Sequence, residues 1–86
     1  MEYSYHKNFK KKVAKLPKNI QNKLDERLLL FVSDGRNPVL NNHALRGEYL
    51  GSYGVNITGN LRAIYRYESK NHIQFVDIDT HSNLYG

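Results

Sequence analysis

Two histidines and two arginines are the residues whose types suit acid–base chemistry on a charged substrate. His81 follows the last alternating segment, and His43 begins the stretch NHALRGEYLG. An imidazole titrates near neutral pH, so it can give or take a proton. Arg62 and Arg66 are separated by an even number of residues in an alternating segment, which places both side chains on one face. An arginine fork can bind a phosphate and stabilise the charge of its transition state, so these residues predict phosphoryl chemistry.

Each of these residues also has a simpler interpretation. A histidine at a strand end is commonly a hydrogen-bonding loop residue. The two arginines could pair with acids on neighbouring strands, namely Glu68, Asp77 or Asp79. Asn56 shares a face with Arg62 only if the turn between their segments has the right register. Both interpretations stay open at this stage.

Metal and cofactor chemistry are not predicted. The chain has no cysteine, and His72, Asp77, Asp79 and His81 have no spacing typical of metal ligands. No glycine-rich phosphate loop joins a strand to a helix, and no Gly-x-Ser-x-Gly motif occurs. We therefore expect neither a metal nor a cofactor.

A block of lysines carries the excess positive charge. The net charge is +5, and the excess lies in residues 7–18, where no acid interrupts the series Lys7, Lys10, Lys11, Lys12, Lys15 and Lys18. Such a block favours contact with a polyanion, and with nucleic acid before membrane, because phosphate contacts release counterions. The alternative is a solvated face that only maintains solubility. Likewise, the seven tyrosines suit base stacking, but those in alternating segments are more typical of a core.

The hydrophobic pattern predicts the elements that position these residues. Residues 2–6 alternate as a first strand, and apolar residues at helical spacing predict two helices separated by Pro17, the second closing at Asp34 and Gly35. Residues 53–58, 61–67 and 73–78 alternate as strands, the first two joined by a Thr58–Asn60 hairpin turn. We predict an α+β fold: an N-terminal strand and a two-helix hairpin packed on a mostly antiparallel four-stranded sheet.

The length and hydropathy predict one cytoplasmic domain. At 86 residues the chain has room for a single domain, residues 1–86. The longest apolar run is five residues, Leu28–Val32, whereas a membrane span needs about 20. The N-terminus lacks the apolar segment of a signal peptide. We expect a small soluble protein that has no membrane contact.

Three motifs together resemble the toxins of bacterial type II toxin–antitoxin modules. They are HALRGEYLGSY from His43, ITGNLRAIYRY from Ile57 and DTHSNLYG from Asp79, in the order and spacing of the RelE/ParE superfamily and closest to its YafQ-like branch. The resemblance covers essentially the whole chain. It implies a microbial-ribonuclease-like fold and a ribosome-dependent messenger-RNA endonuclease. It also implies a cognate antitoxin and binding to operator DNA only through the antitoxin complex.

The resemblance also assigns roles to residues. In this family a ribose 2′-hydroxyl attacks the adjacent phosphorus without a metal. His81 matches the C-terminal catalytic histidine, Tyr85 the aromatic residue behind it, His43 the histidine of the second strand and Arg62 a phosphate-binding arginine. Ribosomal or messenger RNA would lie on the basic side chains Lys7, Lys10, Lys11, Lys12, Lys15, Lys18, Arg46 and Arg66.

Three positions depart from the YafQ-like pattern. Asn56 stands for a second strand histidine, Asn60 for an acidic residue and Asp77 for an arginine. Asparagine cannot transfer a proton, and Asp77 would repel a phosphate unless an arginine neutralises it. His43 and His81 would then form the acid–base pair, with Arg62 as the cation. Two alternatives remain: a ParE-type poison of DNA gyrase on the same fold, and a degenerate toxin without catalysis.

Overall fold

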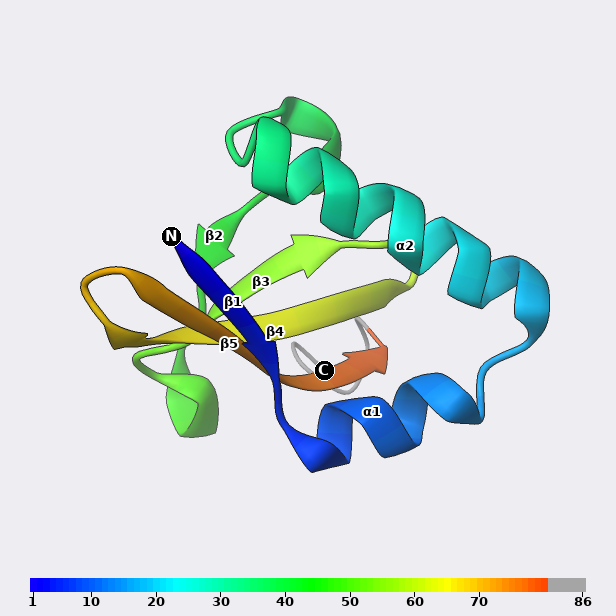
Figure 1. Ribbon diagram of the computed structural model, residues 1–86, viewed down its shortest axis with the longest axis horizontal. Coiled ribbons are helices and arrows are strands. Elements are labelled where there is room, and N and C mark those ends of the chain that lie inside the picture. The colour runs from blue at the N-terminus through cyan, green and yellow to red at the C-terminus, as the bar shows by residue number, and fades with distance from the viewer. Residues whose placement is uncertain (81–86) are drawn as a thin grey trace.

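The computed structural model describes residues 1–80 and has an α+β architecture (Figure 1). Two helices precede most of the sheet, as the sequence predicts. In chain order the elements are β1 (Glu2–Tyr5), α1 (Lys7–Ala14), α2 (Lys18–Ser33), the 3-10 helix η1 (Pro38–Leu40), β2 (His43–Ala44), the 3-10 helix η2 (Gly47–Tyr49), β3 (Tyr53–Asn56), β4 (Leu61–Ser69) and β5 (His72–Thr80).

The sheet has five strands in the order β1-β5-β4-β3-β2, and every neighbouring pair is antiparallel except β1 and β5. The prediction of four strands was therefore wrong by one. The additional strand is β2, which has only two residues, His43 and Ala44, and pairs with β3. Two residues are too few to show a period-two pattern in a sequence.

The helices begin and end where local chemistry dictates. His6 caps α1, because its Nδ1 accepts the Asn8 backbone N–H at 3.1 Å. The helix ends at Ala14, before Leu16, because the residue preceding a proline is disfavoured in the helical conformation. Pro17 occupies the cap position of α2, where its missing N–H costs no hydrogen bond.

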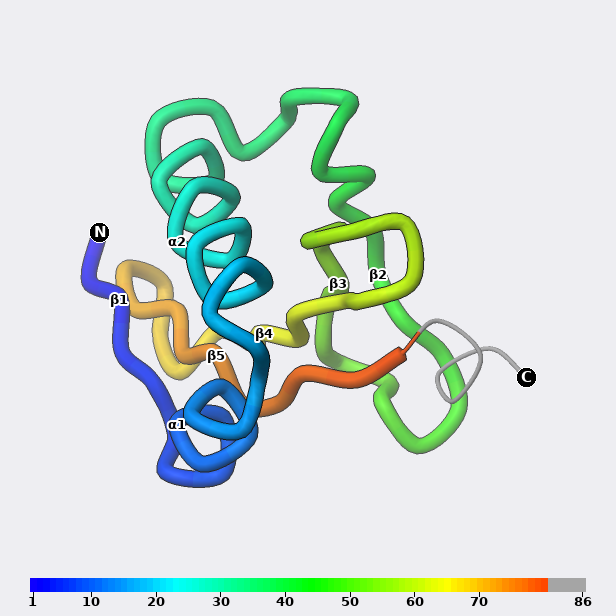
Figure 2. Tube along the Cα trace, turned by 90° about the vertical axis from the view of Figure 1, so that its right-hand side faces the viewer, coloured from blue at the N-terminus to red at the C-terminus, as the bar shows by residue number. Residues whose placement is uncertain are grey.

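The two helices lie on one side of the sheet (Figure 2), and an aromatic core fills the space between them and that face. Phe75 of β5 lies at its centre, with ring centroids 5.7 Å from Phe9 of α1, 5.5 Å from Phe31 of α2 and 5.6 Å from Tyr65 of β4. Offset or edge-on aromatic pairs at such distances stabilise beyond their area burial. The interpretation of Tyr65 as core is confirmed, whereas Tyr67, two residues on, is half-exposed.

The opposite face of the sheet is covered only in part. Leu45, just after β2, is buried over Gly54 of β3, and a Cβ at position 54 would lie 3.2 Å from its Cδ2. Ile64 of β4 pairs with Gly54 and is fully buried. The strand segments that carry Asn56, Arg62 and Asp79 continue beyond this small cluster. None of the described helices is long and apolar enough to cross a membrane.

Candidate functional site

Strand register places the polar candidates in two rows on this partly covered face. Asn56 of β3 lies opposite Arg62 of β4, which lies opposite Asp79 of β5. Side chains directly opposite each other leave the same face of a sheet. The expectation that Asn56 and Arg62 share a face is therefore confirmed.

The second row is two residues further along each strand and so lies on the same face. It runs from His43 of β2 to Gly54 of β3, then to Ile64 of β4 and Asp77 of β5. The structure thus gathers His43, Asn56, Arg62, Asp77 and Asp79 on one face from four strands.

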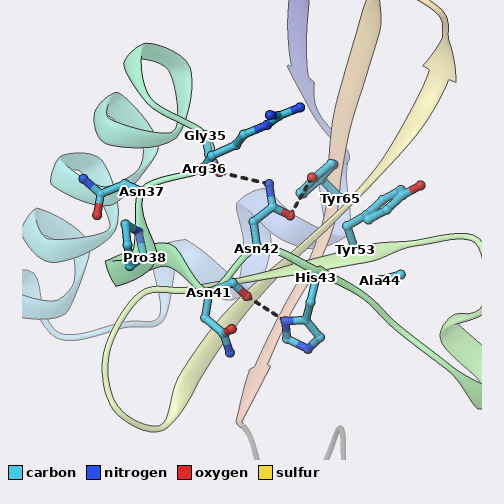
Figure 3. Close-up of a pocket in the computed structure, with 10 residues that line it drawn as sticks. All are labelled: Gly35, Arg36, Asn37, Pro38, Asn41, Asn42, His43, Ala44, Tyr53 and Tyr65. Carbon is cyan, nitrogen blue, oxygen red and sulfur yellow. Dashed lines mark hydrogen bonds between the residues drawn. The ribbon is translucent and has the colours of Figure 1, made fainter.

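His43 is held in one orientation by the chain that precedes it (Figure 3). Its Nδ1 lies 2.7 Å from the backbone oxygen of Asn41. A carbonyl oxygen only accepts hydrogen bonds, so Nδ1 carries the proton and the lone pair of the neutral ring is on Nε2. Asn41 adopts a left-handed conformation with φ of 43°, which asparagine tolerates better than most residues. The arrangement fixes a tautomer suited to proton abstraction.

Arg62 is buried, with 6% of its surface exposed. Its guanidinium Nη1 donates to the backbone oxygen of Thr58 at 3.3 Å, in the turn after β3. Thr58 Oγ1 also accepts the backbone N–H groups of Asn60 and Leu61, so the turn and the arginine hold each other. Asn60 is exposed at the tip of this turn. The permanent positive charge of Arg62 is fixed within the row rather than extended into solvent.

Asp77 is neutralised, although not by an arginine. Lys12 of α1 reaches its Oδ1 at 2.7 Å, and the Tyr49 hydroxyl of η2 donates to Oδ2 at 3.5 Å. The hydrogen bond to Asp77 raises the pKa of Lys12. Lys12, one lysine of the basic block, is therefore ion-paired with a residue of the sheet. The sequence did not indicate this contact, because the two residues are far apart along the chain.

Arg66 does not form a fork with Arg62. Its Nε donates to Glu68 Oε1 at 2.9 Å, so the two arginines bond to partners toward opposite ends of β4. This is the simpler interpretation of Arg66 that the sequence left open. The other basic residues predicted to bind RNA, Lys7, Lys10, Lys11, Lys15, Lys18 and Arg46, are all exposed.

An open hollow of about 560 Å³ lies beside His43, between the loop after α2 and the ends of β2 and β3 (Figure 3). Asn42 spans its wall: its Nδ2 donates to the backbone oxygen of Gly35 at 3.2 Å, and its Oδ1 accepts the Tyr65 hydroxyl at 2.8 Å. Burial raises the pKa of Tyr65 to about 12, so this phenol stays protonated at neutral pH. Tyr65 thus anchors the loop that carries His43. Nothing in the spacing of Asn42 and Tyr65 indicates this bond.

Two predicted catalytic residues, His81 and Tyr85, lie outside the described residues. His81 directly follows Thr80, the last residue of β5, whose register partner is Leu61 of β4. Within residues 1–80, no three histidine or acidic side chains come together in a way that could hold a metal ion.

Comparison with known proteins decides the family. The model of the family described as "Bacterial toxin of type II toxin-antitoxin system, YafQ" matches residues 1–86. The chain belongs to the YafQ toxin family. No curated protein sequence matches it.

Solved structures share the fold of this YafQ-family chain. The crystal structure of YafQ from E. coli strain BL21(DE3) matches with a TM-score of 0.79 at 21% identity, covering 99% of this chain and 98% of that chain. YafQ from the E. coli DinJ-YafQ toxin-antitoxin complex matches with a TM-score of 0.76 at 22% identity, covering 99% and 97%. A YoeB/ParE toxin from Agrobacterium tumefaciens matches with a TM-score of 0.73 at 14% identity, covering 94% and 99%.

Proposed function

We propose that this YafQ-family toxin is an endoribonuclease that cleaves messenger RNA on the ribosome by metal-free acid–base chemistry and so inhibits translation. The observation that carries the proposal is the shared face of His43, Asn56 and Arg62. On this face, His43 has a fixed tautomer and Arg62 supplies a permanent positive charge. Both lie beside the end of β5, the strand that leads to His81. Membership of the family supports the same reaction.

The reaction needs three functions. A base takes the proton of the ribose 2′-hydroxyl, whose oxygen attacks the adjacent phosphorus; an acid gives a proton to the departing 5′-oxygen; and a cation stabilises the phosphorane charge. His43 and His81 supply the base and the acid, each contributing about 10²–10⁴-fold in rate. Arg62, fixed by the Thr58 carbonyl, supplies the charge without reorganisation. Tyr85 is the aromatic residue behind His81, and Asn56 and Asn60 contribute hydrogen bonds instead of protons.

The remaining exposed basic residues hold RNA phosphates away from the cut. Lys7, Lys10, Lys11, Lys15 and Lys18 are exposed on α1 and at the start of α2, and Arg46 is exposed before η2. Lys12 and Arg66 serve the same surface less directly, because each is paired with an acid. Screening by salt should weaken all of these contacts.

A cognate antitoxin is the second proposed partner, as the E. coli DinJ-YafQ complex illustrates for a relative. An acidic segment that folds on binding would cover the lysine face and pair with an edge strand, either β1 or β2. Operator DNA would be bound only through that complex. We place the protein in the cytoplasm, where ribosomes and messages are, without membrane contact.

The test is inducible expression in bacteria with 5′-end mapping of a translated reporter message. Wild type is compared with His81→Gln and His43→Gln. His72→Gln is the matched control, since His72 begins β5 at the end remote from Thr80 and bonds to Ser4. We expect cuts at fixed codon positions that require translation, persist in the control and disappear in the other two variants.

The opposite results are equally informative. Growth arrest with an intact message and induced DNA-damage signalling would replace the nuclease with a gyrase poison. The absence of both cleavage and arrest in wild type would mean that Asn56, Asn60 and Asp77 mark a lost activity.

A further inference from the structure

The hollow beside His43 lies on the helix-facing side of the sheet, next to the loop that follows α2. Ala44 of β2 lies opposite Tyr53 of β3, and both line the hollow together with Tyr65. His43 lies opposite Gly54, so its side chain leaves the other face, and Figure 3 shows its ring across the chain from the two tyrosine rings. The hollow and the cleavage rows therefore adjoin across β2, which has two residues and forms one edge of the sheet.

The tyrosines of this wall differ in burial. Tyr65 belongs to the core, and the Tyr53 ring stacks on it with a centroid distance of 5.3 Å and an interplanar angle of 19°. Tyr53 is itself only partly buried, and the half-exposed Tyr67 meets it edge-on at 5.8 Å. An aromatic ring that is held in place and partly open to solvent offers a surface on which a nucleobase can stack. Tyr53 is therefore a candidate for the base stacking that the tyrosine content suggests.

The polar groups around the tyrosines suit the rest of a nucleotide. Arg36, in the loop after α2, is exposed and has no ion pair within residues 1–80, and none of the described residues that line the hollow is acidic. Asp34, the nearest acid along the chain, accepts from the Asn37 amide instead. Asn42 uses one hydrogen and one lone pair of its amide within the protein, so one donor and one acceptor remain for the edge of a base. The volume of about 560 Å³ also suffices, because sites for small ligands begin at about 300 Å³.

We propose that this hollow is a nucleobase subsite for the RNA strand that is cut. One base of the strand stacks on Tyr53, the Asn42 amide bonds to the edge of that base, and Arg36 holds the adjoining phosphate. The strand then passes over the sheet edge at β2 to reach His43 and Arg62 on the other face. The subsite orients the strand relative to His43 and takes no part in the chemistry. The inference rests on the proposed function, because it takes single-stranded RNA as the substrate.

The experiment measures equilibrium binding of a labelled single-stranded RNA of about ten nucleotides by fluorescence anisotropy, between about 50 and 200 mM salt. The full chain carries His81→Gln so that the probe stays intact. Tyr53→Leu removes the aromatic ring, and Tyr53→Phe is the matched control that keeps it. Ala44→Phe leaves the other wall residues in place and fills the hollow from β2. Arg36→Gln is compared with Lys70→Gln, an equal change of charge in the exposed turn between β4 and β5.

We expect Tyr53→Leu and Ala44→Phe each to weaken RNA binding by about fivefold or more at every salt concentration, because the stacking of one base is lost. Tyr53→Phe should bind RNA as the parent chain does. Arg36→Gln should reduce the slope of log affinity against log salt by about 0.7, the value for one phosphate contact on a single strand, and Lys70→Gln should leave the slope unchanged. Ala44 is exposed, so Ala44→Phe keeps the test valid even where Tyr53→Leu unfolds the protein.

Unchanged RNA affinity in the folded Tyr53→Leu and Ala44→Phe variants would overturn the proposal, as would a parent chain that does not bind the RNA. Loss of binding to a co-expressed antitoxin, with RNA affinity retained, would make the hollow a protein-docking site instead. Reporter cleavage by wild type, with unchanged RNA affinity in the variants, removes the subsite and keeps the nuclease. Weaker RNA binding by the variants, without cleavage in any strain, keeps the subsite and removes the nuclease.

Discussion

Replacing Tyr65 with phenylalanine tests the link between the aromatic core and the loop that carries His43. The Tyr65 side chain is 97% buried, and its ring lies 5.0 Å from that of Phe31 and 5.3 Å from that of Tyr53. Its hydroxyl donates to Asn42 Oδ1 at 2.8 Å. Tyr65→Phe keeps the ring contacts and removes this bond, so at pH 8 we expect a loss of about 1 kcal/mol in the free energy of unfolding.

The difference in the free energy of unfolding between wild type and Tyr65→Phe should decrease as the pH rises. Burial raises the native pKa of Tyr65 from 10 to about 12, so the native state retains the phenolic proton longer than the unfolded state does. A group with a raised native pKa contributes stability below its unfolded pKa and loses that contribution as pH rises toward the native value. Ionisation of Tyr65 should therefore lower the free energy of unfolding of the wild type by about 1.4 kcal/mol at pH 11, relative to neutral pH. At pH 9 this decrease should be about zero.

Urea denaturation at pH 8, 9 and 11 measures this effect. Tyr65→Phe should be less stable than wild type at pH 8 and about equal to it at pH 11, because only wild type carries the ionisable group. Lys12 and Tyr49, whose pKa values are also raised, are common to both proteins and cancel in the comparison. Tyr67→Phe is the matched control, since Tyr67 is half-exposed on the same strand. A stability difference that stays constant from pH 8 to 11 would refute the reasoning.

Three further outcomes follow from the partly covered face. Gly54→Ala should lower the free energy of unfolding by about 1 kcal/mol in urea, because its Cβ would crowd the buried Leu45, and Leu45→Ala in the same chain should relieve the crowding. A double-mutant cycle of Lys12→Met and Asp77→Asn should give a coupling of about 0.2–1 kcal/mol that decreases with salt, since both side chains are partly exposed. His43→Gln should slow reporter cleavage by about 10²-fold or more while leaving the thermal midpoint nearly unchanged.

The sequence correctly predicts which side chains of the sheet face the helices, because apolar residues alternate with polar ones along the strands. Ala63 and Tyr65 alternate with Arg62 and Ile64, and the register confirms that these pairs face opposite sides. Burial of Ile64 is the exception. Alternation places it on the polar side, yet it is fully buried beside Gly54, over which Leu45 returns. A contact made by a distant loop leaves no periodic signal.

The candidate site is predictable in composition and not in arrangement. His43, Asn56 and Arg62 are identifiable from residue type and family resemblance, and the register of one hairpin brings the last two together. The register shift between Ile64 and Tyr65 is not visible in the sequence, yet it decides that Asp77 faces away from the core although Phe75, two residues earlier, faces into it.

Asp77 shows why single-position departures from a family pattern are weak evidence for lost function. By sequence alone, a carboxylate in place of an arginine changes the local charge by two and should repel a phosphate. In the fold, Lys12 reaches across from α1 and restores neutrality at that position, while Tyr49 bonds to the second oxygen. Lys12 and Asp77 together therefore contribute no net charge at that position. The charge available to a phosphate on this face therefore depends on a helix residue more than sixty positions away, and Lys12 and Asp77 should be considered as one unit of the site.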